Sequence, residues 1–155
     1  MYRLAHERAL ERNPHPFVPS GAPARWNSDG VRVAYTSEHP ALAALELLGY
    51  WRQYPQLSGY RLFSANIDDD DIETADETVD PTDTTVTRAY GDAWAASKRS
   101  FALRVPSVVM PVSFNVLVNA IHPKLASFTY QDHGSFSFDS RVDELLQRAK
   151  TKQAP

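Results

Sequence analysis

Short apolar runs, separated by polar or proline-rich segments, divide the chain into elements. Runs rich in β-branched and aromatic residues predict strands at 2–5, 31–36, 60–67, 102–110, 114–120 and 125–130. Helical spacing predicts helices from Ser37 to residue 51 or 53, around 87–100, and after Asp139. Ser37 and Asp139 are suitable N-caps, and Pro106 is expected to break or bulge its strand.

Two segments are not expected to be regular. Residues 13–24 contain four prolines, each of which fixes φ and removes a backbone donor, so they predict a loop. Residues 68–83 are acidic and threonine-rich, and successive aspartates repel one another in a compact element. We therefore expect an acidic surface loop around residues 68–86, with one short strand around 72–79.

The order of these elements predicts the fold class. Strands and helices are interspersed with hairpin-like spacings rather than regular βαβ units. A chain of 155 residues is long enough to bury about two-thirds of its unfolded surface in one core. We therefore predict a single α+β domain over residues 1–155, with mostly antiparallel or mixed sheet and flanking helices.

Composition excludes several classes of function. The net charge of −3 provides no overall basic field for nucleic acid or an anionic membrane, although Arg3, Arg25 and Arg32 allow a local basic patch. There is no cysteine, and the five histidines lack metal-binding spacing, so we expect no metal site. The amino terminus is too polar for a signal peptide, and no apolar run has membrane-spanning length. A cytoplasmic protein is the resulting expectation.

Candidate chemistry gathers early in the chain. Arg25, Tyr35 and Glu46 offer a cation, an aromatic face and a carboxylate, which together suit an anionic, flat-ringed molecule in which positive charge develops. Glu46 also lies seven residues from both His39 and Gln53, which places all three on one polar helical stripe. From pattern alone, a stripe that faces solvent is the favoured interpretation, and a stripe that faces a cleft is the alternative.

Later in the chain, Ser107 follows Pro106 at the interrupted strand. A serine nucleophile with His122 and Glu46 is conceivable, but the Gly-x-Ser-x-Gly elbow is missing. Asn115 and Asn119 point to one face of a strand, where a structural role is slightly favoured over ligand contact. The glycines form neither a Gly-x-Gly-x-x-Gly nor a P-loop motif. A dinucleotide would therefore not bind in the Rossmann manner.

Several short motifs occur together in a characteristic order. They are Ala-Arg-Trp-Asn at 24–27, Val-Ala-Tyr-Thr-Ser at 33–37, Ala-Leu-Ala-Ala-Leu-Glu at 41–46, Leu-Arg-Val-Pro-Ser at 103–107, Asn-Val-Leu-Val-Asn-Ala-Ile-His-Pro at 115–123 and Phe-Ser-Phe-Asp-Ser-Arg at 136–141. In this order they resemble the RES domain, a family named for an arginine, a glutamate and a serine. The resemblance spans nearly the whole chain except the acidic segment.

The resemblance implies a function and partners. RES-domain proteins are toxins of bacterial toxin–antitoxin pairs, with a fold similar to ADP-ribosyltransferases, and they consume NAD by hydrolysis, phosphorolysis or ADP-ribosyl transfer. NAD would be a substrate rather than a resident cofactor, with inorganic phosphate as a candidate co-substrate. The expected partner is a helix-turn-helix, Xre-type antitoxin in a hetero-oligomer, which is compatible with a toxin dimer.

The resemblance also assigns residues. Glu46 would stabilise the cation that forms on ribose, Arg25 would bind pyrophosphate or phosphate, Tyr35 would stack on a ring, and Ser107 would orient the ribose or the glutamate. Further substrate-binding residues would be Arg3, Trp26, Asn27, Asn119 and His122. The alternatives are a catalytically inert RES-fold binding module and, with less support, a serine hydrolase that uses Ser107.

Overall fold

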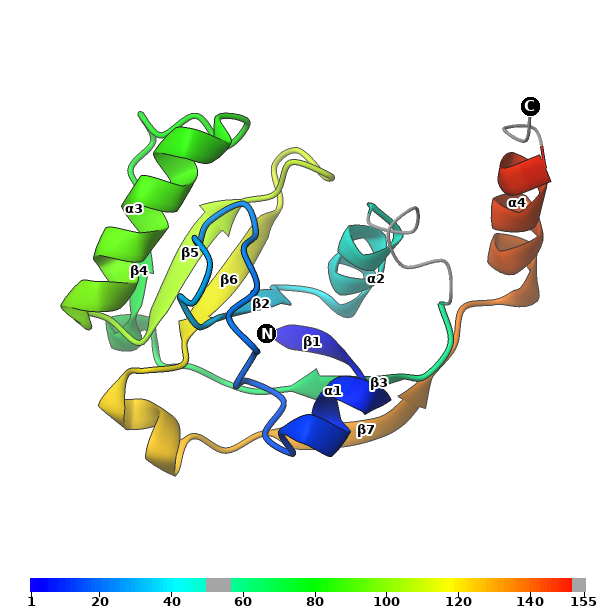
Figure 1. The fold of residues 1–155 in the computed structure, drawn as a ribbon, viewed down its shortest axis with the longest axis horizontal. Helices are drawn as coiled ribbons and strands as arrows, with labels where there is room; N and C mark the ends of the chain where they lie inside the picture. The colour runs from blue at the N-terminus through cyan, green and yellow to red at the C-terminus, as the bar shows by residue number, and fades with distance from the viewer. Residues whose placement is uncertain (50–56, 152–155) are drawn as a thin grey trace.

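The computed structural model describes residues 1–49 and 57–151, and Figure 1 shows their arrangement. Within them, one sheet has the strand order β4-β5-β6-β2-β1-β3-β7, and only the β4–β5 pair is parallel. The strands are β1 Tyr2–His6, β2 Val33–Ser37, β3 Tyr60–Ser64, β4 Ile72–Thr74, β5 Ala102–Pro106, β6 Phe114–Asn119 and β7 Gln131–Phe136. The helices are α1 Glu7–Arg12, α2 Pro40–Gly49, α3 Thr84–Ser97 and α4 Ser140–Thr151, with 3₁₀ turns η1 Asp69–Asp71 and η2 Pro123–Ser127. The predicted α+β class with a mixed, mostly antiparallel sheet is confirmed.

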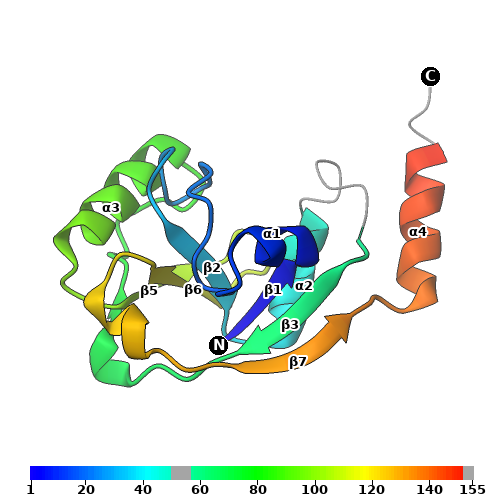
Figure 2. The same cartoon turned by 60° about the horizontal axis from the view of Figure 1, so that its bottom comes forward.

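The sheet consists of two halves that meet at a narrow seam. Strands β1 and β2 are paired only at Tyr2 and Ser37, whereas β2 and β6 are in register from Val33–Asn119 to Ser37–Asn115. Figures 1 and 2 show β5, β6 and β2 running in a different direction from β1, β3 and β7. Helix α3 covers the half that contains β5 and β6, and α2 lies beside β1 and β2. Helix α4 stands apart from the sheet in both views.

Alternating strand residues build a core on each face of the sheet. On one face, Leu103 and Leu117 pack with Trp26 and with Trp94 of α3. On the other face, residues such as Val118 pack with an aromatic group that comprises Phe17, Phe63 and Phe101. Complete burial of such large apolar side chains contributes about 1.5–3 kcal/mol each, so these two clusters hold the sheet between its covering layers.

Close packing of α3 fixes the wall of the first core. A Cβ placed on Gly91 would lie 1.9 Å from the carbonyl oxygen of Trp26, which is far closer than atoms can approach. Only glycine therefore allows α3 to pack directly on the backbone of the loop that carries Trp26. Among the residues that the structure describes, no helix has both the length and the apolar character for a bilayer crossing.

Most element boundaries agree with the sequence to within a few residues, but the start of α2 differs. Ser37 was expected to cap this helix, whereas it is the last residue of β2. The helix begins at Pro40, and Nδ1 of His39 accepts a hydrogen bond from the Ala41 amide. Helix α2 reaches Gly49, and the rest of its predicted length, to residue 51 or 53, lies outside the described residues.

The acidic segment contains the expected short strand and, in addition, a 3₁₀ turn. It forms η1 and strand β4, because Ile72–Thr74 pair with the parallel strand β5. An ion pair between Asp71 and Lys124 offsets part of its negative charge. Helix α3 begins within the segment at Thr84, because the side chain of Asp83 accepts hydrogen bonds from the amides of the first turn.

The predicted strand at 125–130 is wrong. Pro123–Ser127 form the 3₁₀ turn η2, in which Nδ1 of His122 caps the amide of Lys124. The strand follows at Gln131–Phe136 as β7, on the edge of the sheet beside β3. Helix α1, directly after β1, was not predicted either, whereas the last helix does begin after Asp139, which accepts from the Arg141 amide.

Candidate active site

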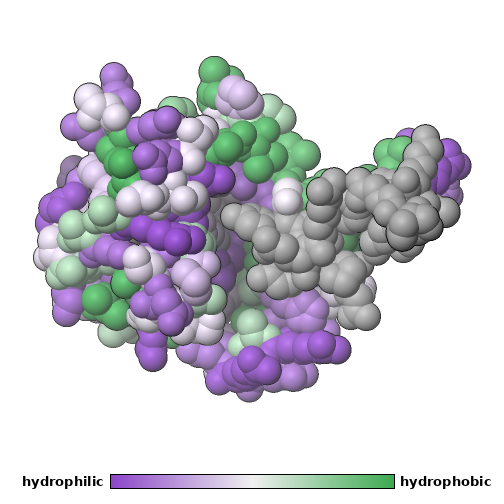
Figure 3. Space-filling view, turned by 45° about the horizontal axis from the view of Figure 1, so that its top comes forward, coloured by the Kyte–Doolittle hydropathy of each residue, from purple (hydrophilic) through white to green (hydrophobic). Residues whose placement is uncertain are grey.

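A cavity of about 560 Å³ opens between α2, the seam of the sheet and the loop that precedes β2. Its lining includes Arg3 from β1, Arg25 and Trp26 from the loop, Tyr35 from β2 and Glu46 from α2. Val108 and Val109, which follow β5, form part of its rim. Figure 3 shows hydrophobic side chains gathered at the upper edge of this view, over the β5–β6 loop, where four of the exposed large hydrophobic residues are Val108, Val109, Met110 and Val112.

Glu46 is held in this cavity by two neutral donors. Its Oε1 accepts hydrogen bonds from Oγ of Ser107 at 2.8 Å and from Nδ2 of Asn115 at 2.5 Å. The side chain of Asn115 is itself held, because Oγ of Ser37 donates to its Oδ1 at 2.7 Å. Among the described residues, no cation lies within ion-pair distance of Glu46. The carboxylate therefore has a fixed orientation, and no described cation pairs with it.

This arrangement overturns the favoured interpretation of the polar stripe. Glu46 is half-buried and lines the cavity, whereas His39 is exposed, and Gln53 lies outside the described residues. The alternative interpretation, in which the stripe faces a cleft, holds for Glu46. The structure also brings Ser107 to Glu46, as the motifs suggested, and adds Asn115, to which the sequence had given a structural role.

Arg3 supplies a buried cation to the same cavity. Its Nη1 donates to the carbonyl of Tyr35 at 2.6 Å, and its Nε is buried with no hydrogen-bond partner among the described residues. Burial lowers the pKa of Arg3 to about 10, so that the guanidinium still carries its charge at neutral pH. A buried donor without a partner is costly unless a ligand satisfies it, and an anion would satisfy both the donor and the charge.

Arg25 lies at the wall of the cavity that is formed by the loop. Its Nη1 donates to the carbonyl oxygens of Pro81 at 2.9 Å and of Thr82 at 3.5 Å. The residue is half-buried, and no carboxylate pairs with it among the described residues. Arg25 thus adds a second positive charge to the lining of the cavity that Arg3 also lines.

Tyr35 braces the loop that carries Arg25 and Trp26. Its hydroxyl accepts from the Trp26 amide at 2.8 Å and donates to Oδ1 of Asn27 at 2.9 Å. Asn27 is buried, and its Nδ2 donates to the carbonyls of Ala22, Ser28 and Val31. Tyr35 and Trp26 both line the cavity, whereas Asn27 is not among the residues that line it. These contacts favour a supporting role for Tyr35 and Asn27.

Asn119 and His122 are not brought to the cavity. Asn119 is fully buried, and its Nδ2 donates to the carbonyl of Ala95 at 2.8 Å, which ties β6 to α3. His122 caps η2, and its ring packs against Phe101. The hydrogen bonds of both residues explain their place in the motif without any contact with a ligand.

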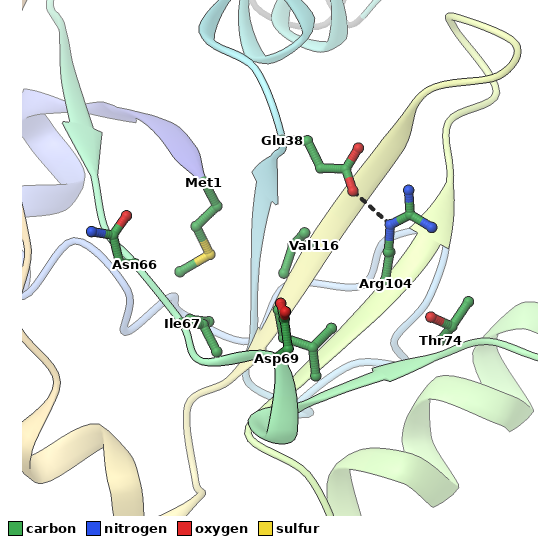
Figure 4. Close-up of a pocket in the computed structure, with 9 residues that line it drawn as sticks. Met1, Glu38, Asn66, Ile67, Asp69, Thr74, Arg104 and Val116 are labelled. Carbon is green, nitrogen blue, oxygen red and sulfur yellow. Dashed lines mark hydrogen bonds and ion pairs between the residues drawn. The ribbon is translucent and has the colours of Figure 1, made fainter.

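A second cavity, of about 520 Å³, lies on the other face of the same strands. Glu38 and Arg104 line it and form an ion pair at 2.5 Å, which Figure 4 shows. The guanidinium of Arg104 also lies 3.4 Å from the centre of the Phe114 ring. None of the predicted site residues lines this cavity; of its two carboxylates, Glu38 is already paired with Arg104, and Asp69 is exposed. Among the described residues, no three histidine, aspartate or glutamate side chains are grouped so that they would hold a metal ion.

The fold and the cavity define an α+β domain whose candidate active site is lined by an oriented carboxylate and by an arginine with a buried Nε. The family model of the RES domain matches residues 1–139, and the chain belongs to the RES domain family.

Three curated relatives match at similar identity. The chain is 28% identical to Toxin Res of Yersinia enterocolitica over 149 residues, which cover 92% of this chain and 98% of that protein. It is 27% identical to Toxin Res of Photorhabdus laumondii, which covers 97% of this chain and 98% of that protein. It is also 27% identical to the Prs ADP-ribosylating toxin of a Sphingobium species, with 76% of this chain and 79% of that protein covered.

Proposed function

We propose that the protein is the toxin of a toxin–antitoxin pair and that it consumes NAD by cleaving the bond between nicotinamide and ribose. The observation that carries the proposal is the carboxylate of Glu46, held by two neutral donors in a cavity that also contains the buried guanidinium of Arg3. Membership of the RES family and the names of the relatives, two called Toxin Res and one an ADP-ribosylating toxin, support it.

The chemistry needs a fixed negative charge. When the bond from ribose C1′ to the nicotinamide nitrogen breaks, the electron pair stays on the ring nitrogen, and the sugar gains oxocarbenium character. Glu46 stabilises that positive charge, and its orientation is set before the reaction by Ser107 and Asn115. Nicotinamide leaves as a neutral ring, so the step needs no general acid.

In this proposal, arginine side chains bind the pyrophosphate of the substrate. NAD carries two phosphates, and a guanidinium offers a planar set of donors that suits phosphate oxygens. Arg3 has a buried donor without a partner among the described residues, and Arg25 lies on the loop wall. In this proposal both bind the pyrophosphate, while Tyr35 and Asn27 hold the loop in place instead of forming a stacking surface.

The acceptor of the ADP-ribosyl group is water, inorganic phosphate or a protein side chain. Each would form the new bond to C1′ as nicotinamide leaves and would release any proton to solvent. The name of the Sphingobium relative supports the protein acceptor as one of the three. We further propose a cytoplasmic location and an Xre-type, helix-turn-helix antitoxin as the partner.

The geometry supports the two alternatives, a serine hydrolase and an inert binding module, less well than it supports NAD cleavage. The hydroxyl of Ser107 donates to Glu46 and accepts from the Met110 amide, and no histidine lines the cavity among the described residues. A serine nucleophile would need the imidazole of His122 as its base, and His122 caps η2 outside the cavity. An inert binding module gives no reason for the buried donor of Arg3 to face the same cavity as an oriented carboxylate.

Purified protein incubated with NAD, with and without phosphate, tests the proposal by mass spectrometry of the products. We expect nicotinamide together with ADP-ribose, with its phosphorylated form, or with ADP-ribose on added cellular proteins. Glu46→Gln should lower the rate of all three by about 10²–10³, because the amide keeps the shape and removes the charge. Equal nicotinamide release by wild type and Glu46→Gln, or none from folded wild type under any of these conditions, would rule out the mechanism.

A further inference from the structure

We propose that Ser37 and Asn115 form a positioning relay that fixes which oxygen of Glu46 faces the substrate. The relay rests on the proposed function for its catalytic consequence, but its geometry is independent of it. Oγ of Ser37 donates to Oδ1 of Asn115, and Nδ2 of Asn115 donates to Oε1 of Glu46. One hydroxyl thus acts on the carboxylate through one amide.

The donors and acceptors along this chain of hydrogen bonds can be arranged in only one direction, from Ser37 through Asn115 to Glu46. An ionised carboxylate can only accept, so the amide must present its nitrogen to Glu46. The carbonyl of that amide then faces Ser37, whose hydroxyl supplies the matching donor. A rotated amide would place two acceptors against each other, so Ser37 opposes rotation of Asn115.

The sheet holds the relay rigidly. Ser37 is the last residue of β2 and is 3% exposed, and it lies directly opposite Asn115 in the antiparallel β2–β6 register. Neither residue can shift along its strand without breaking the pairing that sets all the neighbouring side chains. Because the strand register fixes the positions of Ser37 and Asn115, the relay also fixes the position of the Glu46 carboxylate on α2.

The second donor to Glu46 has a different setting. Ser107 follows the end of β5, and its Oγ accepts from the amide of Met110, within a loop of exposed apolar residues. In that loop Val112 is 98% exposed and has a φ of 64°, which is unfavourable for a β-branched side chain. Since Ser107 depends on this loop, the strand-based relay is the more constant of the two supports.

The relay also makes the two oxygens of Glu46 unequal. Both donors reach Oε1, and no described residue donates to Oε2. Oε2 is therefore the oxygen available to the ribose and to the cation that forms there. Without the relay the carboxylate can rotate, and its interaction with the transition state weakens while substrate binding by the arginines is kept.

The test compares steady-state nicotinamide release by wild type, Asn115→Ala, Ser37→Ala and Ser37→Thr. We expect kcat of Asn115→Ala to fall about 100-fold while KM changes less than about threefold, because misplacement of a catalytic group affects the chemical step. Ser37→Ala should lose roughly tenfold in kcat, and Ser37→Thr, which restores a hydroxyl, should recover most of that loss. Asn66→Ala, an exposed asparagine on the lining of the other cavity, is the matched control.

A second measurement does not depend on activity. The NMR signals of the Asn115 side-chain amide are assigned by their absence in Asn115→Ala. In wild type they should show one amide proton that is hydrogen-bonded to a carboxylate. Ser37→Ala and Glu46→Gln should each shift these signals, while thermal denaturation confirms folding. Signals that stay fixed in both variants would overturn the relay even if wild type proves inactive on NAD. Unchanged kcat in folded Asn115→Ala would overturn it where wild type is active.

Discussion

Glu38 and Glu46 lie close in the chain but in cavities on opposite faces of the same strands. Glu38 pairs with Arg104 at 2.5 Å, so its charge is neutralised by a full cation. Glu46 accepts from a hydroxyl and an amide, which fix its position and leave its charge uncompensated. Two carboxylates of the same chain thus have different capacities, and the type of partner decides which one can respond to a developing positive charge.

The energetic meaning of the two arrangements also differs. An ion pair that is about one-third exposed on each side contributes about 0–1 kcal/mol to stability and supports the ends of strands. Neutral donors that hold a charged group add little to net stability but keep that group ready for the transition state. The face with Glu38 should therefore respond to substitution in its stability, and the face with Glu46 in its activity.

The largest expected effect separates the two carboxylates directly. Glu46→Gln should lower kcat for nicotinamide release by about 10²–10³, because it removes the charge and keeps an acceptor for both donors. Glu38→Gln, the matched change in the other cavity, should leave kcat within about twofold of wild type. Similar losses in the two variants, measured under the same conditions, would remove the distinction on which the comparison depends.

Arg3 and Arg104 extend the comparison to cations. Arg3→Gln should raise KM for NAD by roughly 10- to 100-fold with a smaller effect on kcat, because a bond to a charged phosphate is lost. Arg104→Gln removes a guanidinium that is already paired, so KM should not change. Binding of NAD to the folded but inactive Glu46→Gln, with and without the Arg3 change, measures the same loss by calorimetry. An unchanged affinity would assign the pyrophosphate to Arg25 alone.

Gly91 tests how strongly the cavity with Glu46 depends on packing behind its wall. Gly91→Ala places a Cβ against the carbonyl of Trp26, and α3 must move away. We expect a loss of about 1–3 kcal/mol in the free energy of unfolding by urea, together with lower activity, because Trp26 lines the cavity. Ala96→Ser, an exposed position on the same helix, is the control that should change neither quantity.

The smallest effect concerns a third carboxylate, Glu73, which pairs with Arg99 as Glu38 pairs with Arg104. Hydrogen bonds from the Arg99 guanidinium, both at 2.6 Å, lower the pKa of Glu73 from 4.5. Since the folded pKa lies below the unfolded value, the stabilisation is present above pH 4.5 and is lost as the pH falls through the folded pKa. The melting temperature of wild type should therefore fall more steeply with decreasing pH, below about pH 4.5, than that of Glu73→Gln. Parallel curves would contradict this.

Much of the fold could be predicted because its strands carry apolar residues on both faces. The buried runs of β2, β5 and β6 give clear signals in sequence, and Asp139 and Pro106 mark boundaries by their own local chemistry. The edge strand β7 is different: it is polar and mostly exposed, so its sequence carried no strand signal. The apolar residues before it, which predicted a strand, belong to η2 and to the aromatic core.

The candidate site was predictable in its members more than in its geometry. Motif order identified Arg25, Tyr35, Glu46 and Ser107; the first three line the cavity, and Ser107 donates a hydrogen bond to Glu46. Periodicity could not show which way the stripe of Glu46 faces, because that depends on how α2 packs against the sheet. The sequence singled out Asn115 but could not predict its contact with Glu46, since its position opposite Ser37 arises from pairing between strands that are distant in the sequence.

The pairing of β2 with β6, which come from distant parts of the chain, has a consequence for how the cavity forms during translation. Arg3 and Glu46 leave the ribosome early, while Ser107 and Asn115 follow only after the acidic segment and α3 have been made. A nascent chain therefore holds its carboxylate without both donors in place until β6, which carries Asn115, has emerged and paired with β2. Synthesis that stops before that point yields a fragment in which Glu46 lacks the Asn115 donor, and the finished site appears only once β6 has paired with β2.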